Sequence, residues 1–397
     1  MLWILASVSI ALLCYEIPTL ISAVLWPLWN NPNALQTDFH YYYEAAQRFS
    51  QDRHLLYRLS DDVIAGFAYP PPAIVPFVAL ARLPLGAALL ALTVASYGVL
   101  VSAVRQWCAY LRRHGFTVEG RTMAAIMLIA LAFGPTYMNA IFGQVNTFVL
   151  ASAVAFVCLL NVPAAAGSML ALGIWLKIYP AFLAVIALWE RRAWRALAWA
   201  GAIAALIALV ALPLVPLDAY RTFLTGVLPA RLDKTAIHIT NQSVAAFLER
   251  FRQPPEMFLN WTGHEAVTVS GAVRAINALL MVAGVLYFWR RFAVRGSHPS
   301  AAAAVIAMVA VVAPLGWGHT YVMVLPLVIL RLISMRAAGP PAAAAIVMCV
   351  LAFMIPAGRH LPLDWAPGWA QNLVYSRYLI ATVVLLVLDL DRRPRRA

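Results

Sequence analysis

Residues 196–215 read ALAWAGAIAALIALVALPLV, a stretch without a single charged side chain. An α-helix rises about 1.5 Å per residue, so about 20 apolar residues span the roughly 30 Å hydrocarbon core of a bilayer. Arg191, Arg192 and Arg195 stand at the start of this run, as is typical where a helix leaves the membrane on its cytoplasmic side. The stretch therefore predicts a transmembrane helix.

Apolar runs of this kind recur along the whole chain. They cover residues 2–26, 70–82, 85–107, 122–138, 143–161, 166–189, 195–215, 265–289, 300–315, 320–335, 340–356 and 374–390. No internal repeat or flexible linker divides them. We therefore expect one all-α, polytopic membrane domain over residues 1–397, with about twelve crossings and short interfacial helices in the first outer loop.

The composition excludes several classes of protein. Hydrophobic residues make up 63% of the chain and charged residues only 11%, far from the roughly 25% charged of soluble domains. The net charge of +13 comes largely from arginines clustered between apolar runs, as in membrane proteins, so nucleic-acid binding is not expected. The four cysteines form no Cys-x-x-Cys pair and predict neither a disulfide framework nor a zinc site.

The arginines also predict the orientation. Twelve crossings put both termini on one side, and the basic tail Arg392, Arg393, Arg395 and Arg396 makes that side cytoplasmic. The polar stretches 27–69, 216–264 and 357–373 then face outside, whereas the amides near residue 144 start at the inner side. The loop 108–121 with Arg112 and Arg113 would also face outside. Either this loop is an exception to the tendency of basic loops to stay in the cytoplasm, or a neighbouring run is re-entrant and does not cross.

The first polar stretch carries a carboxylate soon after the first apolar run. It reads Gln36-Thr37-Asp38-Phe39-His40-Tyr41-Tyr42-Tyr43-Glu44. An enzyme that transfers a group to a hydroxyl needs one base to accept the proton of that hydroxyl. Asp38, at the membrane boundary, is our candidate. The alternative is that Asp38 is the N-cap of a helix over residues 39–50.

Further polar side chains stand at the ends of apolar runs. Tyr69, before three prolines, either packs on a ligand or is an interfacial anchor. Gln144 and Asn146 open an apolar helix. Lys177 lies inside a run, where an ammonium costs about 2.5 to 3.5 kcal/mol, so it faces a cavity or pairs with Glu16.

Two later stretches add cations and amides. The stretch 231–243 runs from Arg231 to Asn241-Gln242-Ser243 and is followed by Arg250; it either binds a phosphodiester through charge-assisted hydrogen bonds or is an ordinary solvated loop. His319, next to Trp317, lies where a run meets the outside and is either structural or part of a site. No nucleotide-binding or zinc-type motif appears, and no cluster of carboxylates demands a metal.

Taken in order, these motifs resemble the membrane mannosyltransferases of glycosyltransferase family 87, within the GT-C superfamily of enzymes that use polyprenyl-phosphate sugars. The resemblance rests on six short motifs: Asp38-Phe39-His40-x-Tyr42, Tyr69-Pro70-Pro71, Gly143-Gln144-x-Asn146, Lys177 with Pro180, Asn241-Gln242-Ser243, and Trp317-x-His319. Each motif is weak alone, but six in the same order are hard to explain by chance.

The resemblance implies a helical GT-C fold and a single inverting displacement with Asp38 as general base and no cofactor. It implies transfer of a hexose, above all mannose, from a polyprenyl-phosphate donor to a lipid or glycan acceptor on the extracytoplasmic face of the inner membrane. The implied donor- or acceptor-binding residues are His40, Tyr42, Tyr69, Gln144, Asn146, Lys177, Asn241, Gln242, Ser243, Trp317 and His319. His319 would help to bind the donor phosphate. Family members often have two adjacent histidines there, whereas Thr320 follows here, so one contact is missing.

Three alternatives stay open. The chain could use another polyprenyl-phosphate sugar, such as arabinose or glucose. It could be a polytopic lipid or solute transporter with Lys177 and Glu16 as its coupling pair, although no two similar halves are visible. It could also be a catalytically inactive scaffold.

Overall fold

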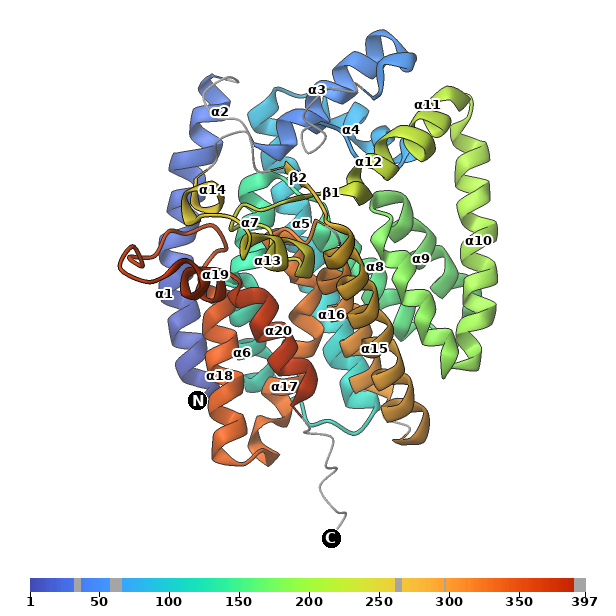
Figure 1. Ribbon diagram of the computed structural model, residues 1–397. Helices are drawn as coiled ribbons and strands as arrows, with labels where there is room; N and C mark the ends of the chain where they lie inside the picture. The colour runs from blue at the N-terminus through green and yellow to red at the C-terminus, as the bar shows by residue number, and fades with distance from the viewer. Residues whose placement is uncertain (32–36, 58–65, 261–265, 296–297, 314, 389–397) are drawn as a thin grey trace.

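The computed structural model describes the whole chain except residues 32–36, 58–65, 261–265, 296–297, 314 and 389–397. The basic tail that predicted the orientation of the chain lies outside the described residues. Figure 1 shows a bundle of helices, with Met1 at one end and the amphipathic helix α3 at the other.

Most helices run along the bundle. They are α1 (Leu2–Leu20), continued by a π-helical turn (Ile21–Leu25) and α2 (Trp26–Asn30), then α5 (Leu85–Arg113), α6 (Gly120–Leu131), α7 (Gly134–Phe142), α8 (Asn146–Cys158), α9 (Pro163–Leu176), the 3₁₀ helix η4 (Tyr179–Leu188), α10 (Arg191–Ala211), α15 (Gly271–Arg295), α16 (His298–Val312), the 3₁₀ helix η6 (Gly318–Val324), α17 (Leu325–Ser334), a 3₁₀ turn (Met335–Ala337), α18 (Pro340–Met354) and α20 (Arg377–Val387).

Shorter elements lie from the middle of the bundle to its end away from Met1 (Figure 1). They are α3 (Asp38–Gln51), 3₁₀ turns at Arg53–Leu55 and Pro71–Ala73, α4 (Ile74–Leu80), α11 (Leu217–Thr222), a π-helical turn (Phe223–Val227), α12 (Leu228–Asp233), β1 (Lys234–Ala236), α13 (Val244–Arg250), α14 (Pro255–Leu259), β2 (Ala266–Thr268) and α19 (Gly368–Tyr375). The two strands pair antiparallel, with Thr235 opposite Val267. The described parts of the first two expected outer loops are thus gathered at one end.

The lengths of the helices make the chain a multi-pass membrane protein. Within the described residues, four stretches are long and apolar enough to cross a bilayer: Leu2–Asn30, Leu85–Arg113, Arg191–Ala211 and Gly271–Arg290. Two bent pairs raise the number to six, namely α6 with α7 (45°) and α19 with α20 (63°). The other apolar helices have 10–17 residues. Helix length alone thus supports four to six crossings rather than the expected twelve.

The run expected to cross at 70–82 is too short to do so. It forms the helical stretch Pro71–Leu80, which is about 15 Å long, half the thickness of the hydrocarbon core. Gly86, at the start of α5, packs against the backbone of Trp29 in α2. The 29 residues of α5 then carry Arg113 to the end where α1 begins. The Arg-rich loop after α5 therefore lies at the Met1 end, because a neighbouring run does not cross.

The run expected at 166–189 is two segments that turn back at Lys177. α9 lies parallel to α10, since Gly167 packs against Ala200 and the indole nitrogen of Trp175 donates to the carbonyl of Ala204 at 3.1 Å. η4 then returns to the start of α10. Lys177 is therefore at the α3 end of the bundle. Gln144, in the turn between α7 and α8, lies there too, which corrects the inner position expected for it.

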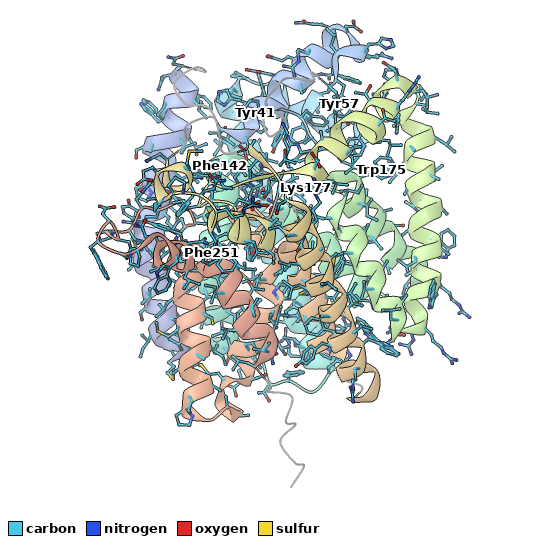
Figure 2. The ribbon with its side chains drawn as sticks, viewed as in Figure 1. Tyr41, Tyr57, Phe142, Trp175, Lys177 and Phe251 are labelled. Atoms are coloured by element: carbon cyan, nitrogen blue, oxygen red, sulfur yellow. The ribbon has the colours of Figure 1, made fainter. Side chains whose placement is uncertain are left out.

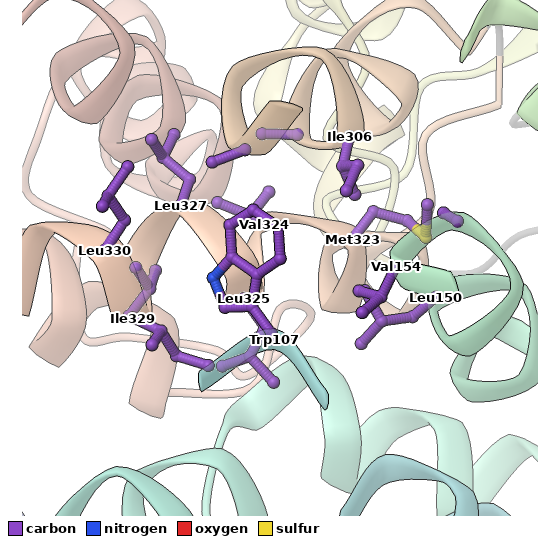
Figure 3. Packing of buried hydrophobic residues seen from close by; sticks show 14 of the residues in the cluster. Trp107, Leu150, Val154, Ile306, Met323, Val324, Leu325, Leu327, Ile329 and Leu330 are labelled. Carbon is purple, nitrogen blue, oxygen red and sulfur yellow. The ribbon is translucent and has the colours of Figure 1, made fainter. Parts of the chain in front are cut away.

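The centre of the bundle packs around Trp107 of α5. Figure 3 shows its indole near Val324 and Leu325, with Leu150 and Val154 of α8 close by. Its Nε1 donates to the carbonyl oxygen of Pro326 at 3.0 Å. This packing joins α5, α8 and the η6–α17 segment, and so fixes the position of the residues that begin η6.

Candidate active site

A cavity of about 580 Å³ lies at the α3 end of the bundle. In Figure 2, Lys177 and Phe142 lie near the middle of this region, with Tyr41 and Tyr57 above them. The cavity has a size typical of small-molecule sites. Seven of the predicted site residues line it: Asp38, Tyr42, Tyr69, Gln144, Lys177, Trp317 and His319.

Asp38 is the first residue of α3, and its neighbour Thr37 is the N-cap. The backbone N–H of Thr37 donates to Nδ1 of His40 at 3.1 Å, which completes a capping box. Because Thr37 and His40 cap the helix, the carboxylate of Asp38 lies in the cavity wall, with 38% of its side chain exposed. The N-cap alternative for Asp38 is therefore excluded.

Gln144 connects four side chains around the cavity. Its Nε2 donates to Oδ2 of Asp38 at 2.6 Å and to the hydroxyl of Tyr42 at 2.7 Å. Its Oε1 accepts from the hydroxyl of Tyr69 at 3.0 Å and from Nζ of Lys177 at 2.8 Å. The amide is thus held in one orientation, with its donor side toward the carboxylate and its acceptor side toward the ammonium.

Gly143 makes this placement possible. It ends α7 in the left-handed conformation, with φ +62°, which glycine adopts without strain. A Cβ at this position would lie 2.5 Å from Cβ of Phe39 and 2.7 Å from Cδ1 of Leu89. The close approach of the α7–α8 turn to α3 brings Gln144 within reach of Asp38.

The surroundings of Asp38 favour its ionised form. Burial raises the pKa of the carboxyl, but the nearby ring of His319, the hydrogen bond from Gln144 and the charge of Lys177 together lower it further than burial raises it. The net result is a pKa below the ordinary value. At neutral pH Asp38 is therefore a carboxylate that can accept a proton from a ligand.

Lys177 follows the last residue of α9 and reaches into the same cavity. Its ammonium lies 5.2 Å from the ring centre of Tyr69 and 5.8 Å from that of Tyr179, where cation–π attraction adds to its bond with Gln144. Glu16 is not its partner: in the described part of the chain, neither carboxyl oxygen of Glu16 has a hydrogen bond. The pair of Lys177 and Glu16 that the transporter hypothesis expected is therefore not formed in this structure.

His319 is the second residue of η6 and lies opposite Asp38, with 3.7 Å between its Nε2 and Oδ2 of Asp38. Behind the ring, Nδ2 of Asn146 lies 2.8 Å from Nδ1 of His319. Asn146 is fully buried and does not line the cavity. Its side chain is linked to the cavity wall by the contact with His319 and by a hydrogen bond from the hydroxyl of Tyr179 to its Oδ1.

Four predicted binding residues have other contacts. His40 caps α3, as described above. Asn241, Gln242 and Ser243 are fully buried behind the cavity wall. Asn241 donates to the carbonyl of Ala236, and Gln242 donates to the carbonyls of Ile239 and Tyr375. Ser243 caps α13. None of these four residues lines the cavity, and each makes hydrogen bonds to the protein itself.

Arg250 is likewise turned inward. Its guanidinium donates to the carbonyl oxygens of Ile237, His238 and Asn241 and to the side chains of Asn372 and Ser376. These bonds tie the 231–243 stretch to α19 and α20. Part of the cationic stretch therefore faces the cavity and part of it bonds to the protein itself.

Arg231, His238 and Thr240 from that stretch do line the cavity, as do Tyr179 and Thr320. The sequence singled out Arg231 and His238 only as members of a cationic group, and Tyr179 only as the neighbour of Lys177. A signal that could have found Tyr179 is its position two residues after Lys177 and directly before Pro180. Among the described residues, no group of three His, Cys, Asp or Glu side chains is arranged to hold a metal ion.

A multi-pass helical membrane protein with one carboxylate, an imidazole and an ammonium around a cavity at one end has the architecture of a membrane-embedded group-transfer enzyme. The model of glycosyltransferase family 87 matches residues 67–315, more than half of the chain. The chain belongs to this family and is a membrane glycosyltransferase. Asp38 and His319 lie outside the matched region, one before it and one after it.

The full length of the chain is also similar to a characterised enzyme. It is 27% identical over 430 aligned positions, which cover 100% of this chain and 92% of the relative, to the polyprenol-phosphate-mannose-dependent alpha-(1-2)-phosphatidylinositol mannoside mannosyltransferase of Mycobacterium tuberculosis. The similarity thus includes the segment with Asp38 and the η6 region, both of which the family match leaves out.

Proposed function

We propose that this protein transfers mannose from a polyprenyl phosphate to a glycolipid or glycan acceptor on the extracytoplasmic face of the inner membrane. The full-length similarity to a polyprenol-phosphate-mannose-dependent enzyme supports the donor class. The observation that carries the proposal is the carboxylate of Asp38, held ionised in a cavity with Gln144, Lys177 and His319.

In the proposed reaction the acceptor hydroxyl gives its proton to Asp38 while its oxygen attacks the anomeric carbon of mannose. The bond between that carbon and the donor phosphate oxygen breaks, and the lipid phosphate leaves with the electron pair. A phosphate is a good leaving group, so the protein mainly has to orient the acceptor and stabilise negative charge. Lys177 and Arg231, both in the cavity wall, are the proposed cations for the phosphate.

The set of acids supports a single displacement with inversion. Double displacement at a sugar usually needs a second carboxylate as nucleophile. Among the described residues that line the cavity, Asp38 is the sole acid. One base and no second carboxylate fit direct attack by the acceptor.

The apolar part of the wall suits an isoprenoid chain. Phe223, Val227, Leu228 and Leu232 lie along one face of the α11–α12 segment and line the cavity, close in sequence to Arg231. Phe223 also stacks on Tyr57 of the first outer segment, with 6.0 Å between ring centres. A lipid phosphate would thus meet an apolar wall that ends at cations.

The arginines support the proposed side of the membrane. Arg112, Arg113, Arg191 and Arg192 lie at the ends of α5 and α10 that are opposite the cavity. Because basic loops stay in the cytoplasm, the cavity would open to the extracytoplasmic side. We treat residues 1–397 as one domain, since the wall draws on segments from α3 to η6.

The test is a transfer assay with the purified protein in lipid nanodiscs. It is given radiolabelled polyprenyl phosphates carrying mannose, glucose or arabinose, together with a lipid extract as acceptor. We expect a labelled product from the mannose donor, and Asp38→Asn to lower its rate by about 10² to 10⁴ fold. Asp364→Asn, in an exposed outer loop, is the matched control. Full activity of Asp38→Asn, or no product from any donor, would refute the proposal.

A further inference from the structure

The residues behind His319 form a chain of hydrogen bonds whose direction is fixed by the backbone. Nδ2 of Asn139 lies 2.7 Å from the carbonyl oxygens of both Pro135 and His319. Carbonyl oxygens only accept, so this atom of Asn139 has to be the amide nitrogen. Its Oδ1 then faces the backbone N–H of Asn146 at 3.2 Å, which only donates. The orientation of Asn139 is thus determined twice.

The orientation of Asn146 follows from that of Asn139. The side-chain atom of Asn146 that lies 3.0 Å from Oδ1 of Asn139 has to be a donor, which makes it Nδ2. Its Oδ1 in turn accepts from the hydroxyl of Tyr179. The same Nδ2 lies 2.8 Å from Nδ1 of His319, so it donates to that ring nitrogen.

A ring nitrogen that accepts a hydrogen bond carries no proton. In the neutral imidazole the proton then sits on Nε2, the atom that faces Oδ2 of Asp38 across 3.7 Å. A proton on Nδ1 would collide with the N–H of Asn146, which disfavours the imidazolium as well. The charged groups that face the ring are Asp38 from α3 and Lys177 after α9.

We propose that Asn146 is a positioning residue that keeps His319 neutral with its proton on Nε2, so that His319 acts as a fixed hydrogen-bond donor and never as a base. The Nε2–H group of His319 would point to the Asp38 carboxylate before substrate binds and to the phosphate of the lipid-linked sugar when substrate is bound. The catalytic part of this inference rests on the proposed function. The protonation of the ring does not.

The direct test is ¹⁵N NMR of ring-labelled histidine in the full-length protein in nanodiscs, because the shifts of the two ring nitrogens report which one is protonated. The chain has eight histidines, and the His319 signal is the one lost in His319→Gln. We expect a neutral, Nε2-protonated ring from about pH 5 to 8. A ring protonated on Nδ1, or an imidazolium at neutral pH, would overturn the inference whatever the transfer assay gives.

The kinetic test uses Asn146→Asp, which turns the donor behind the ring into an acceptor. The introduced carboxylate accepts Nδ1–H, leaves a bare Nε2 toward Asp38 and restores Nε2–H only when the ring is protonated. We expect transfer to fall about 10² fold at neutral pH and to rise as the pH is lowered. In the parent, lowering the pH can only reduce transfer, as Asp38 becomes protonated. A uniform loss with the parent's pH profile would show that Asn146 is merely structural.

Two substitutions of His319 separate hydrogen-bond donation from proton transfer. The terminal amide of glutamine places an N–H near the position of Nε2, so we expect His319→Gln to lose no more than about tenfold in transfer and His319→Ala to lose about 10² fold. Equal losses in the two variants would contradict a role as a neutral donor. If no donor is consumed but the NMR result holds, the proposed function fails and the assignment of the ring proton stands.

Discussion

Replacing Gln144 by glutamate gives the sharpest test of the role of Asp38. The side chains have nearly the same shape, so the fold should be kept. The amide nitrogen that lies 2.6 Å from Oδ2 of Asp38 becomes an oxygen, however, and a hydrogen-bond donor to the carboxylate becomes a second carboxyl group. Two carboxylates at this distance do not both ionise easily, so we expect the pKa of Asp38 to rise in Gln144→Glu.

The size of the effect follows from the distances. At an effective dielectric constant of about 20, two unit charges 4 Å apart repel by about 4 kcal/mol, and each tenfold change in a protonation equilibrium corresponds to about 1.36 kcal/mol. Lys177, with Nζ 2.8 Å from Oε1 of Gln144, offsets part of the repulsion. We therefore expect the acid limb of the pH–rate profile to move up by about 1 to 3 pH units.

The direction in which the acid limb of the pH–rate profile moves distinguishes Gln144→Glu from the parent. In the parent the pKa of Asp38 lies below its ordinary value, because the nearby ring of His319, the hydrogen bond from Gln144 and the charge of Lys177 outweigh burial. Transfer should therefore fall only at distinctly acidic pH. In Gln144→Glu, transfer should be slow in mildly acidic buffer and recover as the pH rises. Gln144→Leu removes the hydrogen bond without adding a charge and should move the profile less.

The measurement is the single-turnover rate of transfer from saturating donor across the pH range, for the parent and both variants. Saturation separates ionisation of the base from binding of the donor. If Gln144→Glu had the same acid limb as the parent and only a lower plateau, the group that limits transfer would not be Asp38.

Two further predictions concern the scaffold and its orientation. Gly143→Ala forces a Cβ to within 2.5 Å of Phe39 in a left-handed residue, so it should cost about 1 to 3 kcal/mol of stability and lower transfer, as measured by thermal unfolding in detergent and by rate. Gly98→Ala, where a Cβ meets no atom within 4 Å in the middle of α5, should leave the unfolding midpoint equal or higher; equal losses in both would refute the steric argument. For orientation, Glu44→Cys in a Cys14→Ser background should react with an impermeant thiol reagent from outside intact cells, and Arg113→Cys only after permeabilisation, since both positions are exposed at opposite ends of the bundle. The reverse pattern would invert the proposed topology.

The sequence indicated the residues that line the cavity better than it indicated the path of the chain. Asp38, Gln144 and Lys177 were recognised because a polar side chain near a long apolar run has few structural reasons to be there. The threading failed at 70–82 and 166–189, because a run of apolar residues does not reveal where a helix turns back. The false crossing at 70–82 placed Gln144 at the wrong end of the bundle. The missed turn at Lys177 compensated for this error, so the start of α10 was again placed correctly.

The remaining errors have a different physical cause. Composition identified the stretch 231–243 as a polar group near the site, and Arg231 and His238 do line the cavity. The side chains of Asn241, Gln242 and Ser243 bond instead to backbone groups, both nearby in the sequence and, for Gln242, at the end of α19. Whether an amide faces a ligand or its own backbone depends on the dihedral angles of the turn, and neither residue type nor spacing records them.

The site and the breaks in the membrane helices have a common origin. Gln144 follows the end of α7, Lys177 follows the end of α9, and His319 lies at the start of η6, after α16 has ended. An interrupted helix leaves backbone and side-chain polar groups that lipid cannot satisfy, so such breaks persist only where they line a cavity or bond to one another. Here they do both, because Gln144 bonds to Lys177 and to Asp38, and His319 faces Asp38. The polar groups that make the interruptions tolerable in a membrane are therefore the groups available to orient an acceptor and a phosphate, and a substitution that healed one of these breaks with a continuous apolar helix would remove part of the site.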